Sequence, residues 1–325
     1  MSVFEKKIVR VIQDDPELMH LTWMVNNICQ NKCTYCLPSL NSGTGHHYKW
    51  ENAKKFLKVL FERYPKIHCS ITGGEPSMSP FLPEMVKMFQ DAGHTIGMTS
   101  NAYAPVEYWQ EVSKDLNYIC FSYHAENPMD DFLDKVMYAA QNTMVTVRVM
   151  MHSQHWEHTV SVYESICKLN HVFVEPVRIL DWGGPGRQAH VYTQEQLDWF
   201  TKAEQLQGHR KVNIIENDNM PKVPSISASY QFEDGSIVTG TNTLDHINAG
   251  QTNFSGYVCE IGLKSLFIDS TGDVLLSNCC VGGTQGHLDK PEEMQWPEKP
   301  VICTKKICHC TIDVNINKWK RGYFK

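Results

Sequence analysis

The sequence predicts an α/β fold in which an open, partial barrel of six strand–helix units precedes a small cysteine-rich region built on a β-hairpin. Short apolar runs alternate with amphipathic stretches from about residue 20 to residue 180, a pattern that indicates parallel strands joined by right-handed helical crossovers. Six units are too few to close a barrel of eight. Six of the 12 cysteines follow residue 258, and a length of 325 residues allows about two domains at ~150 residues each.

The expected elements follow from hydrophobic periodicity. Six short apolar runs are the expected strands, at residues 21–25, 67–72, 95–99, 118–122, 145–150 and 172–180. Amphipathic stretches between them are the expected helices, at about residues 49–64, 80–92, 105–115, 129–142 and 156–169. A further helix is expected over residues 193–207, with Thr193 as its N-cap. Two β-rich runs within residues 263–277 predict a hairpin.

These elements divide the chain into three parts. Residues 1–190 are the expected partial barrel, residues 191–258 form a connecting region without an assigned fold, and residues 259–325 form the cysteine-rich domain. The roughly 20 residues before the first expected strand are too few for a further N-terminal domain that binds a leader peptide.

Composition excludes several classes of protein. Hydrophobic residues are 42% and charged residues 20%, as in ordinary globular proteins rather than disordered or fibrous ones. The formal net charge of -6 disfavours a large nucleic-acid substrate without excluding one. A charged N-terminus and the lack of a long apolar run predict neither a signal peptide nor a membrane span. We therefore expect a cytoplasmic protein, in which clustered cysteines are metal ligands or catalytic groups rather than disulfides.

The first cysteine set directly follows the first expected strand. Cys29, Cys33 and Cys36 form a CxxxCxxC motif. Three thiolates on one short loop can hold three irons of a cubane cluster and leave the fourth iron open for a ligand. A structural zinc site would need a fourth ligand, for which His46 and His47 are the nearest candidates. The spacing alone leaves both readings open.

A second motif follows the next expected strand, in the segment Ile-Thr-Gly-Gly-Glu-Pro. Gly73 and Gly74 allow a close approach of backbone groups, Glu75 offers an acceptor for an ammonium group, and Pro76 stiffens the turn. Alone, this segment is typical of any strand-to-helix turn. One strand–helix unit after a CxxxCxxC loop, it indicates a ligand site.

Together the two motifs resemble the radical S-adenosylmethionine (radical SAM) superfamily, over roughly residues 18–180. Tyr35 matches the aromatic residue that this family places before its last cysteine. The resemblance implies a TIM-like partial (β/α)6 barrel and a [4Fe-4S] cluster on the three cysteines. It also implies that SAM chelates the open iron and that Gly73, Gly74 and Glu75 receive its amino group.

Other positions match the family less specifically. Asn101 ends the third expected strand, where the family carries a polar turn, although a turn cap is the plain alternative. Ser122 resembles a residue that contacts the ribose, and Arg148 one that binds the SAM carboxylate, with a surface ion pair as the alternative. His124 is expected at the same barrel mouth, either near substrate or as a plain loop residue.

The second cysteine set resembles the SPASM/twitch extension of radical SAM enzymes, with a hairpin glycine at Gly272 between cysteines. Six residues separate Gly272 from the next cysteine, and the tail lacks a full SPASM set. The resemblance therefore implies a single auxiliary [4Fe-4S] cluster. Its expected ligands are Cys259, Cys279, Cys308 and Cys310, with Cys280 or Cys303 as alternates. A zinc site that includes His309 is the other interpretation.

Spare thiols suggest a further role. Cys280 and Cys120 are candidate donors of a hydrogen atom to a substrate radical, as in some epimerases of the superfamily, although a free cysteine is ordinarily a small buried hydrophobe. Cys69 and Cys167 are expected in the core.

The resemblance implies an enzyme that cleaves SAM reductively to a 5′-deoxyadenosyl radical, which abstracts hydrogen from a peptide or small molecule. Whether it is an oxidoreductase, an epimerase or isomerase, or a transferase stays open. A nucleotide or nucleic-acid base is the alternative substrate, and a non-catalytic zinc protein is the alternative class. An external one-electron reductant, such as flavodoxin or ferredoxin, is the implied partner.

Overall fold

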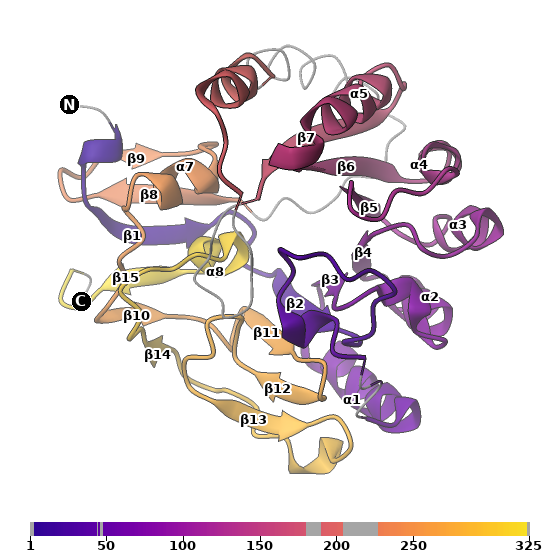
Figure 1. The fold of residues 1–325 in the computed structure, drawn as a ribbon. Coiled ribbons are helices and arrows are strands. Elements are labelled where there is room, and N and C mark those ends of the chain that lie inside the picture. The colour runs from indigo at the N-terminus through magenta and orange to yellow at the C-terminus, as the bar shows by residue number, and fades with distance from the viewer. Residues whose placement is uncertain (1–2, 44, 46–47, 180–189, 204–226, 324–325) are drawn as a thin grey trace. The chain divides into compact units, whose positions relative to one another are not determined.

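The computed structural model describes residues 3–43, 45, 48–179, 190–203 and 227–323 (Figure 1). His46, His47 and part of the connecting region lie outside the described residues. The chain divides into two compact units, which we describe separately. The first unit comprises Met1–Met24, His46–Ser70 and Pro224–Lys325, and the second comprises Val25–Gly45 and Ile71–Val223.

Four parallel strands in sequence order form the sheet of the second unit. They are β4 (Thr95–Ser100), β5 (Tyr118–His124), β6 (Met144–Met151) and β7 (Val172–Arg178). The helices between and before them are α2 (Leu82–Asp91), α3 (Val106–Val112), α4 (Phe132–Ala139) and α5 (Trp156–Ile166). Three short 3-10 turns also belong to this unit: η2 (Pro38–Leu40), η3 (Pro76–Met78) and η4 (Ser153–His155). The α/β class and the strand–helix alternation are therefore confirmed.

Side-chain alternation gives this sheet two unlike faces. Trp109 of α3 contacts Phe121 of β5 at a ring-centroid distance of 4.8 Å, so the odd-numbered side chains of β5 face the helices. The odd-numbered valines of β6 are likewise fully buried. Even-numbered side chains, including Ser122 and Arg148, occupy the other face, and that face carries the polar residues of the candidate site.

A capping box begins the helix over residues 194–203. The Thr193 hydroxyl accepts from the Gln196 main-chain N–H (3.3 Å), and the Gln196 side-chain oxygen accepts from the Thr193 N–H (3.1 Å). Each side-chain oxygen satisfies a main-chain N–H donor that the first helical turn leaves unpaired. The expected N-cap is confirmed.

The first unit contains the earliest expected strand and helix and the C-terminal region. It includes β2 (Met19–Met24), α1 (Trp50–Arg63) and β3 (Ile67–Thr72), and the last two residues of β3 belong to the second unit. β11 (Ser265–Ile268) pairs parallel to β2 and antiparallel to β12 (Asp273–Leu275), which in turn pairs with β13 (Thr284–His287). The expected hairpin over residues 263–277 is confirmed.

A six-stranded sheet of the first unit lies outside the sequence-based expectations. Its order is β14-β10-β15-β1-β8-β9, and its described pairings are antiparallel. The strands are β1 (Ile8–Gln13), β8 (Ala228–Phe232), β9 (Ile237–Val238), β10 (Tyr257–Cys259), β14 (Val301–Ile302) and β15 (Lys318–Lys320). The expectation that the first strand begins near residue 21 was therefore wrong. Charges at Lys7 and Arg10 break the apolar run of β1, whose buried face is supplied by the distant β8 and β15.

Short elements complete the first unit: η1 (Val3–Glu5), α7 (Thr243–Asn248), η5 (Pro291–Glu293) and α8 (Thr311–Asn315). Its core packs Tyr230, Phe232 and Phe254 with several cysteines. Among the described residues, no helix is long and apolar enough to cross a membrane.

Candidate metal centres

The CxxxCxxC residues share one short, partly buried loop of the second unit. The Cys36 N–H donates to the Cys33 carbonyl (3.1 Å), which turns the loop back on itself. Cys33 packs with Tyr35 and Ile179. Burial, with a smaller contribution from the neighbouring thiols, raises the pKa of Cys33 to about 11 and also raises the pKa of Cys29. The thiols therefore lie close enough to affect each other's charge. A bound cation would lower these pKa values again, because it stabilises the thiolates.

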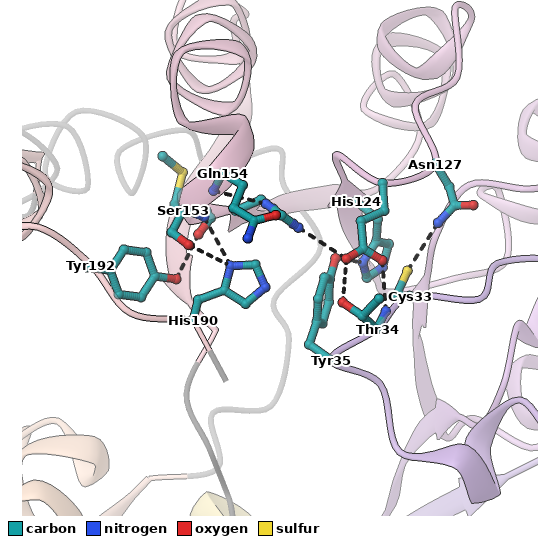
Figure 2. A network of polar contacts seen from close by, with 12 residues as sticks. Cys33, Thr34, Tyr35, His124, Asn127, Ser153, Gln154, His190 and Tyr192 are labelled. Atoms are coloured by element: carbon teal, nitrogen blue, oxygen red, sulfur yellow. Dashed lines mark hydrogen bonds and ion pairs between the residues drawn. The ribbon is translucent and has the colours of Figure 1, made fainter. Parts of the chain in front are cut away.

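Two asparagine amides donate to these sulfurs. Asn101, directly after β4, lies 3.4 Å from Cys29 Sγ through its Nδ2 atom. Asn127, shortly after β5, lies 3.4 Å from Cys33 Sγ in the same way (Figure 2). Hydrogen-bond donors around partly buried thiols fit a thiolate-ligated iron–sulfur cluster, because such donors stabilise the negative charge that its sulfurs carry.

The Gly-Gly-Glu-Pro segment packs directly against the start of the cysteine loop. Gly74 N–H donates to the Asn26 carbonyl (2.9 Å), and Glu75 N–H donates to the Ile28 carbonyl (2.6 Å). A Cβ on Gly73 would lie 2.5 Å from the Asn26 carbonyl oxygen, and one on Gly74 would lie 2.2 Å from that of Ile28. The two glycines thus allow two backbone segments to touch. A contact of these glycines with SAM stays a prediction.

Replacing Gly74 with alanine is expected to lower the free energy of unfolding by at least ~3 kcal/mol, because the new methyl group meets backbone atoms that cannot rotate away. Urea unfolding followed by circular dichroism measures this loss. Gly93→Ala is the matched control, since Gly93 has open space but a φ of 74°, and its expected cost is the ~1–2 kcal/mol of a left-handed alanine. An equal loss in the two variants would contradict the close approach.

The Glu75 carboxylate is fully buried and holds the end of β4. Its Oε1 accepts from the Ser77 N–H (2.9 Å), the Ser77 hydroxyl (2.6 Å) and the Ser100 hydroxyl (2.6 Å). Its Oε2 accepts from the Asn101 N–H (2.7 Å). Burial raises the pKa of Glu75, and these hydrogen bonds oppose that rise. Glu75 therefore positions Asn101, and its contact with an ammonium group stays a prediction.

Ser122, Arg148 and Glu175 occupy neighbouring positions across β5, β6 and β7. Residues paired in this way project from the same face of a sheet. Arg148 Nε lies 3.2 Å from Glu175 Oε2, and the Arg148 side chain is half-exposed. The structure thus shows the ion pair that the sequence left as the alternative for Arg148. Contacts of Ser122 and Arg148 with SAM stay predictions.

His124 contacts the aromatic residue of the cysteine loop. The Tyr35 hydroxyl lies 2.8 Å from His124 Nδ1, and the two rings stack at a centroid distance of 5.9 Å. Burial lowers the pKa of His124 to about 4, which keeps the ring neutral near pH 7. His124 therefore supports the cysteine loop. A contact of His124 with substrate stays a prediction.

Glu126 clamps the middle of the cysteine loop. Its Oε2 accepts from the Thr34 N–H (2.8 Å), and its Oε1 accepts from the Thr34 hydroxyl (2.5 Å) and from His152 Nε2 (3.1 Å). Burial would raise the pKa of Glu126, but the hydrogen bonds from Thr34 and His152 bring it below its usual value. Sequence reasoning missed this carboxylate, whose only signal is its place just after a strand end.

The ligand atoms of Glu126, His152 and His190 lie within 4.8 Å of one another. A metal ion could bind to three ligand atoms at that spacing, but the hydrogen bonds favour a structural role in which these residues hold the cysteine loop. Gln154 N–H donates to His152 Nδ1 (3.3 Å), and Ser153 N–H donates to His190 Nδ1 (3.1 Å). Each neutral ring therefore carries its hydrogen on Nε2. A metal-bound histidine needs the opposite arrangement, in which Nδ1–H donates to an acceptor.

The C-terminal thiols gather in the core of the first unit. Cys259, Cys303 and Cys308 are buried together, and Cys279 packs against them. Burial, with a contribution from Asp313, raises the pKa of Cys279 to about 12, and Cys259 and Cys303 add to the rise. Burial also raises the pKa of Cys310 to about 11. Four thiols in one place fit a metal centre.

Two buried charges accompany these thiols. The Lys318 ammonium, whose residue is 1% exposed, donates to the carbonyl oxygens of Asp313, Val314 and Ile316 at 2.7 Å each. The Asp313 carboxylate accepts from the Cys279 N–H (2.9 Å) and from the Ser277 hydroxyl. Neither charge could be located from the sequence, because no spacing links them to the cysteines.

The two candidate hydrogen-atom donors differ in their surroundings. Cys120 is buried on the polar face of β5, and burial raises its pKa. Cys280 is exposed, has a φ of 56°, and its Sγ lies 3.5 Å from the Asn278 carbonyl oxygen. Cys69 is fully buried, as expected, whereas Cys167 is only partly buried, because it lies at the C-cap of α5.

Comparisons with known proteins find the same family over part of the chain. Residues 23–173 match the family model described as the Radical SAM superfamily. GTP 3',8-cyclase of Haemophilus ducreyi (strain 35000HP / ATCC 700724) is 29% identical over 106 residues, which cover 30% of this chain and 31% of that protein. The matched segment thus spans about a third of the curated relative.

Solved structures show the same fold. Histidine-tagged anSMEcpe with bound AdoMet has a TM-score of 0.54 and 14% identity, and the match covers 84% of this chain and 78% of that one. Native anSMEcpe with AdoMet and the Kp18Cys peptide has a TM-score of 0.51 and 16% identity, with coverage of 84% and 78%. Streptococcus suis SuiB bound to S-adenosylmethionine has a TM-score of 0.50 and 15% identity, with coverage of 84% and 63%. At these identities, the likeness concerns the fold.

Proposed function

We propose that this chain, which belongs to the radical SAM superfamily, binds a [4Fe-4S] cluster on Cys29, Cys33 and Cys36 and uses it to cleave SAM reductively. The observation that carries the proposal is the contact between the two motifs, in which Glu75 fixes Asn101 and Asn101 donates to Cys29. When bound, the cluster and SAM supply a 5′-deoxyadenosyl radical that abstracts a hydrogen atom from substrate.

The chain's own residues hold and shield this chemistry. Glu126 fixes Thr34 inside the cysteine loop, and Tyr35 of the same loop contacts His124. Glu75 and the glycines join the loop to β4 through backbone contacts. Such rigid support keeps the reacting groups in register and limits access of water.

A peptide is the substrate class we favour. The supporting observation is that anSMEcpe, which shares the fold, has been solved with AdoMet and a peptide. A nucleotide is the second candidate, because the curated relative is a GTP 3',8-cyclase.

Anaerobically reconstituted protein tests both the cleavage of SAM and the class of substrate. SAM cleavage to 5′-deoxyadenosine with dithionite supports the enzyme, and colourless protein with stoichiometric zinc contradicts it. A rise in cleavage with peptide or with GTP separates the substrates.

We also propose an auxiliary [4Fe-4S] cluster in the first unit, and an external one-electron reductant, such as flavodoxin or ferredoxin, as a partner of the enzyme. Lys318 supports it, because a buried ammonium that donates to three neutral carbonyls and lies over the Phe254 ring is costly without negative charge nearby. Thiolates and Asp313 would provide that charge. Burial beside Cys259 and Cys308 favours Cys303 over Cys310 as the fourth ligand, and the exposure of Cys280 favours Cys279.

Replacing Cys303 with serine is expected to lower the iron content by about four per chain, the content of one cubane. Cys310→Ser is expected to leave most of the iron in place. Iron analysis and Mössbauer spectra of the reconstituted variants measure the difference, with Cys280→Ser as the control. The reverse order, in which Cys310→Ser loses the iron, would return Cys310 to the ligand set.

A further inference from the structure

We propose that Asn101 and Asn127 set the reduction potential of the cluster on the first cysteine loop, by each donating a side-chain N–H to a ligand sulfur. This inference rests on the proposed function. Asn101 serves Cys29 and Asn127 serves Cys33, each with an Nδ2–Sγ distance of 3.4 Å. Two of the three cysteines in the motif therefore each accept a hydrogen bond from an asparagine amide.

Hydrogen bonds fix both the main chain and the side chain of Asn101. Its main-chain N–H donates to Glu75 Oε2 (2.7 Å), and its side-chain oxygen accepts from Gln30 Nε2 (2.9 Å). The residue is 6% exposed. With the oxygen accepting from Gln30, the amide nitrogen faces Cys29 Sγ and also Gln30 Oε1, each at 3.4 Å. The buried glutamate of the second motif thus acts on the first motif through Asn101.

The Asn127 amide is positioned by its neighbours in sequence. Its main-chain N–H donates to the His124 carbonyl (3.0 Å), and the preceding residue, Glu126, clamps Thr34. Thr34 directly follows Cys33, so the clamp brings Cys33 and the Asn127 amide to each other. A thiolate only accepts hydrogen bonds, and it therefore selects the nitrogen of this amide over the oxygen.

Such donors change the redox balance of a cluster. Reduction adds negative charge, part of which resides on the sulfurs, and an N–H bond to sulfur stabilises the reduced form more than the oxidised form. The two amides should therefore raise the potential and make the cluster easier to reduce.

Asn127→Leu and Asn101→Leu test this in the reconstituted full chain, since leucine keeps similar volume and has no donor. The midpoint potential is measured by a redox titration that follows the electron paramagnetic resonance signal altered by SAM, which separates this cluster from an auxiliary one. Each variant is expected to shift the midpoint to a more negative value by about 59 mV, the equivalent of a tenfold change in a one-electron equilibrium. Asn142→Leu is the control, because that amide donates to the Ser113 hydroxyl (2.9 Å) instead of a thiol.

The outcomes separate the two proposals. An unchanged midpoint in both variants, with iron content and visible absorbance as in the parent, overturns the inference and leaves the proposed function standing. A parent chain that forms no SAM-responsive cluster overturns the proposed function and the inference with it. If a leucine variant does not fold, Asn127→Ala is titrated instead and carries the same expected negative shift.

Discussion

Cys33→Ser is expected to abolish 5′-deoxyadenosine formation and to remove about four irons per chain, the content of one cubane. Cys33 lies in the loop where the thiols are near enough to shift each other's pKa, and it is packed between Tyr35 and Ile179. A serine hydroxyl is a poor iron ligand, and the remaining two thiols cannot hold a cubane with an open corner. The measurements are iron analysis and a chromatographic assay of SAM cleavage under dithionite.

Cys167→Ser is the matched control for this loss. Cys167 is a partly buried thiol at the C-cap of α5, outside both cysteine sets. The control should keep its iron and its rate of SAM cleavage. A Cys33→Ser protein that retains full iron and cleaves SAM at the parental rate would remove the cysteine loop from the mechanism.

Glu75→Gln is expected to weaken SAM binding at least tenfold, about 1.4 kcal/mol, while the cluster still assembles. The amide group of glutamine cannot satisfy the site in either orientation. If its nitrogen replaces Oε1, it meets the Ser77 main-chain N–H, and if it replaces Oε2, it meets the Asn101 main-chain N–H. Two donors then oppose each other in a buried place, so the end of β4 must move.

Calorimetric titration of the reconstituted protein with SAM measures this change, and iron content is checked in parallel. Glu107→Gln, an exposed carboxylate in the first turn of α3, is the control and should bind SAM like the parent. SAM affinity that is unchanged in Glu75→Gln would show that neither Glu75 nor the strand end it holds contributes to the site.

The local sequence was informative wherever one element or one loop contains the whole signal. The expected strand at residues 67–72 coincides with β3, and the neighbouring parallel strands lie within a few residues of their expected limits. Thr193 begins its helix through contacts three residues away, which is why a cap could be predicted. The same locality makes the CxxxCxxC loop readable, since its three thiols are seven residues apart at most.

Other features depend on partners that are far away in the chain. β1 was missed because its register is set by β8 and β15, more than 200 residues later. Arg148 could be assigned to a ligand or to an ion pair from sequence, and only the register of β6 with β7 shows Glu175 beside it.

The sequence by itself predicted the class of chemistry, because the CxxxCxxC loop and the Gly-Gly-Glu-Pro segment are both local motifs and occur together. It also determined the parallel α/β architecture of the first half, because hydrophobic periodicity is a local property. Only the tertiary structure shows which residues support the cysteines. Glu75 accepts a hydrogen bond from Asn101, Glu126 accepts one from Thr34, and Lys318 lies beside the C-terminal thiols. The first two contacts join residues that are 26 and 92 positions apart, and only folding brings their hydrogen-bonding groups within reach.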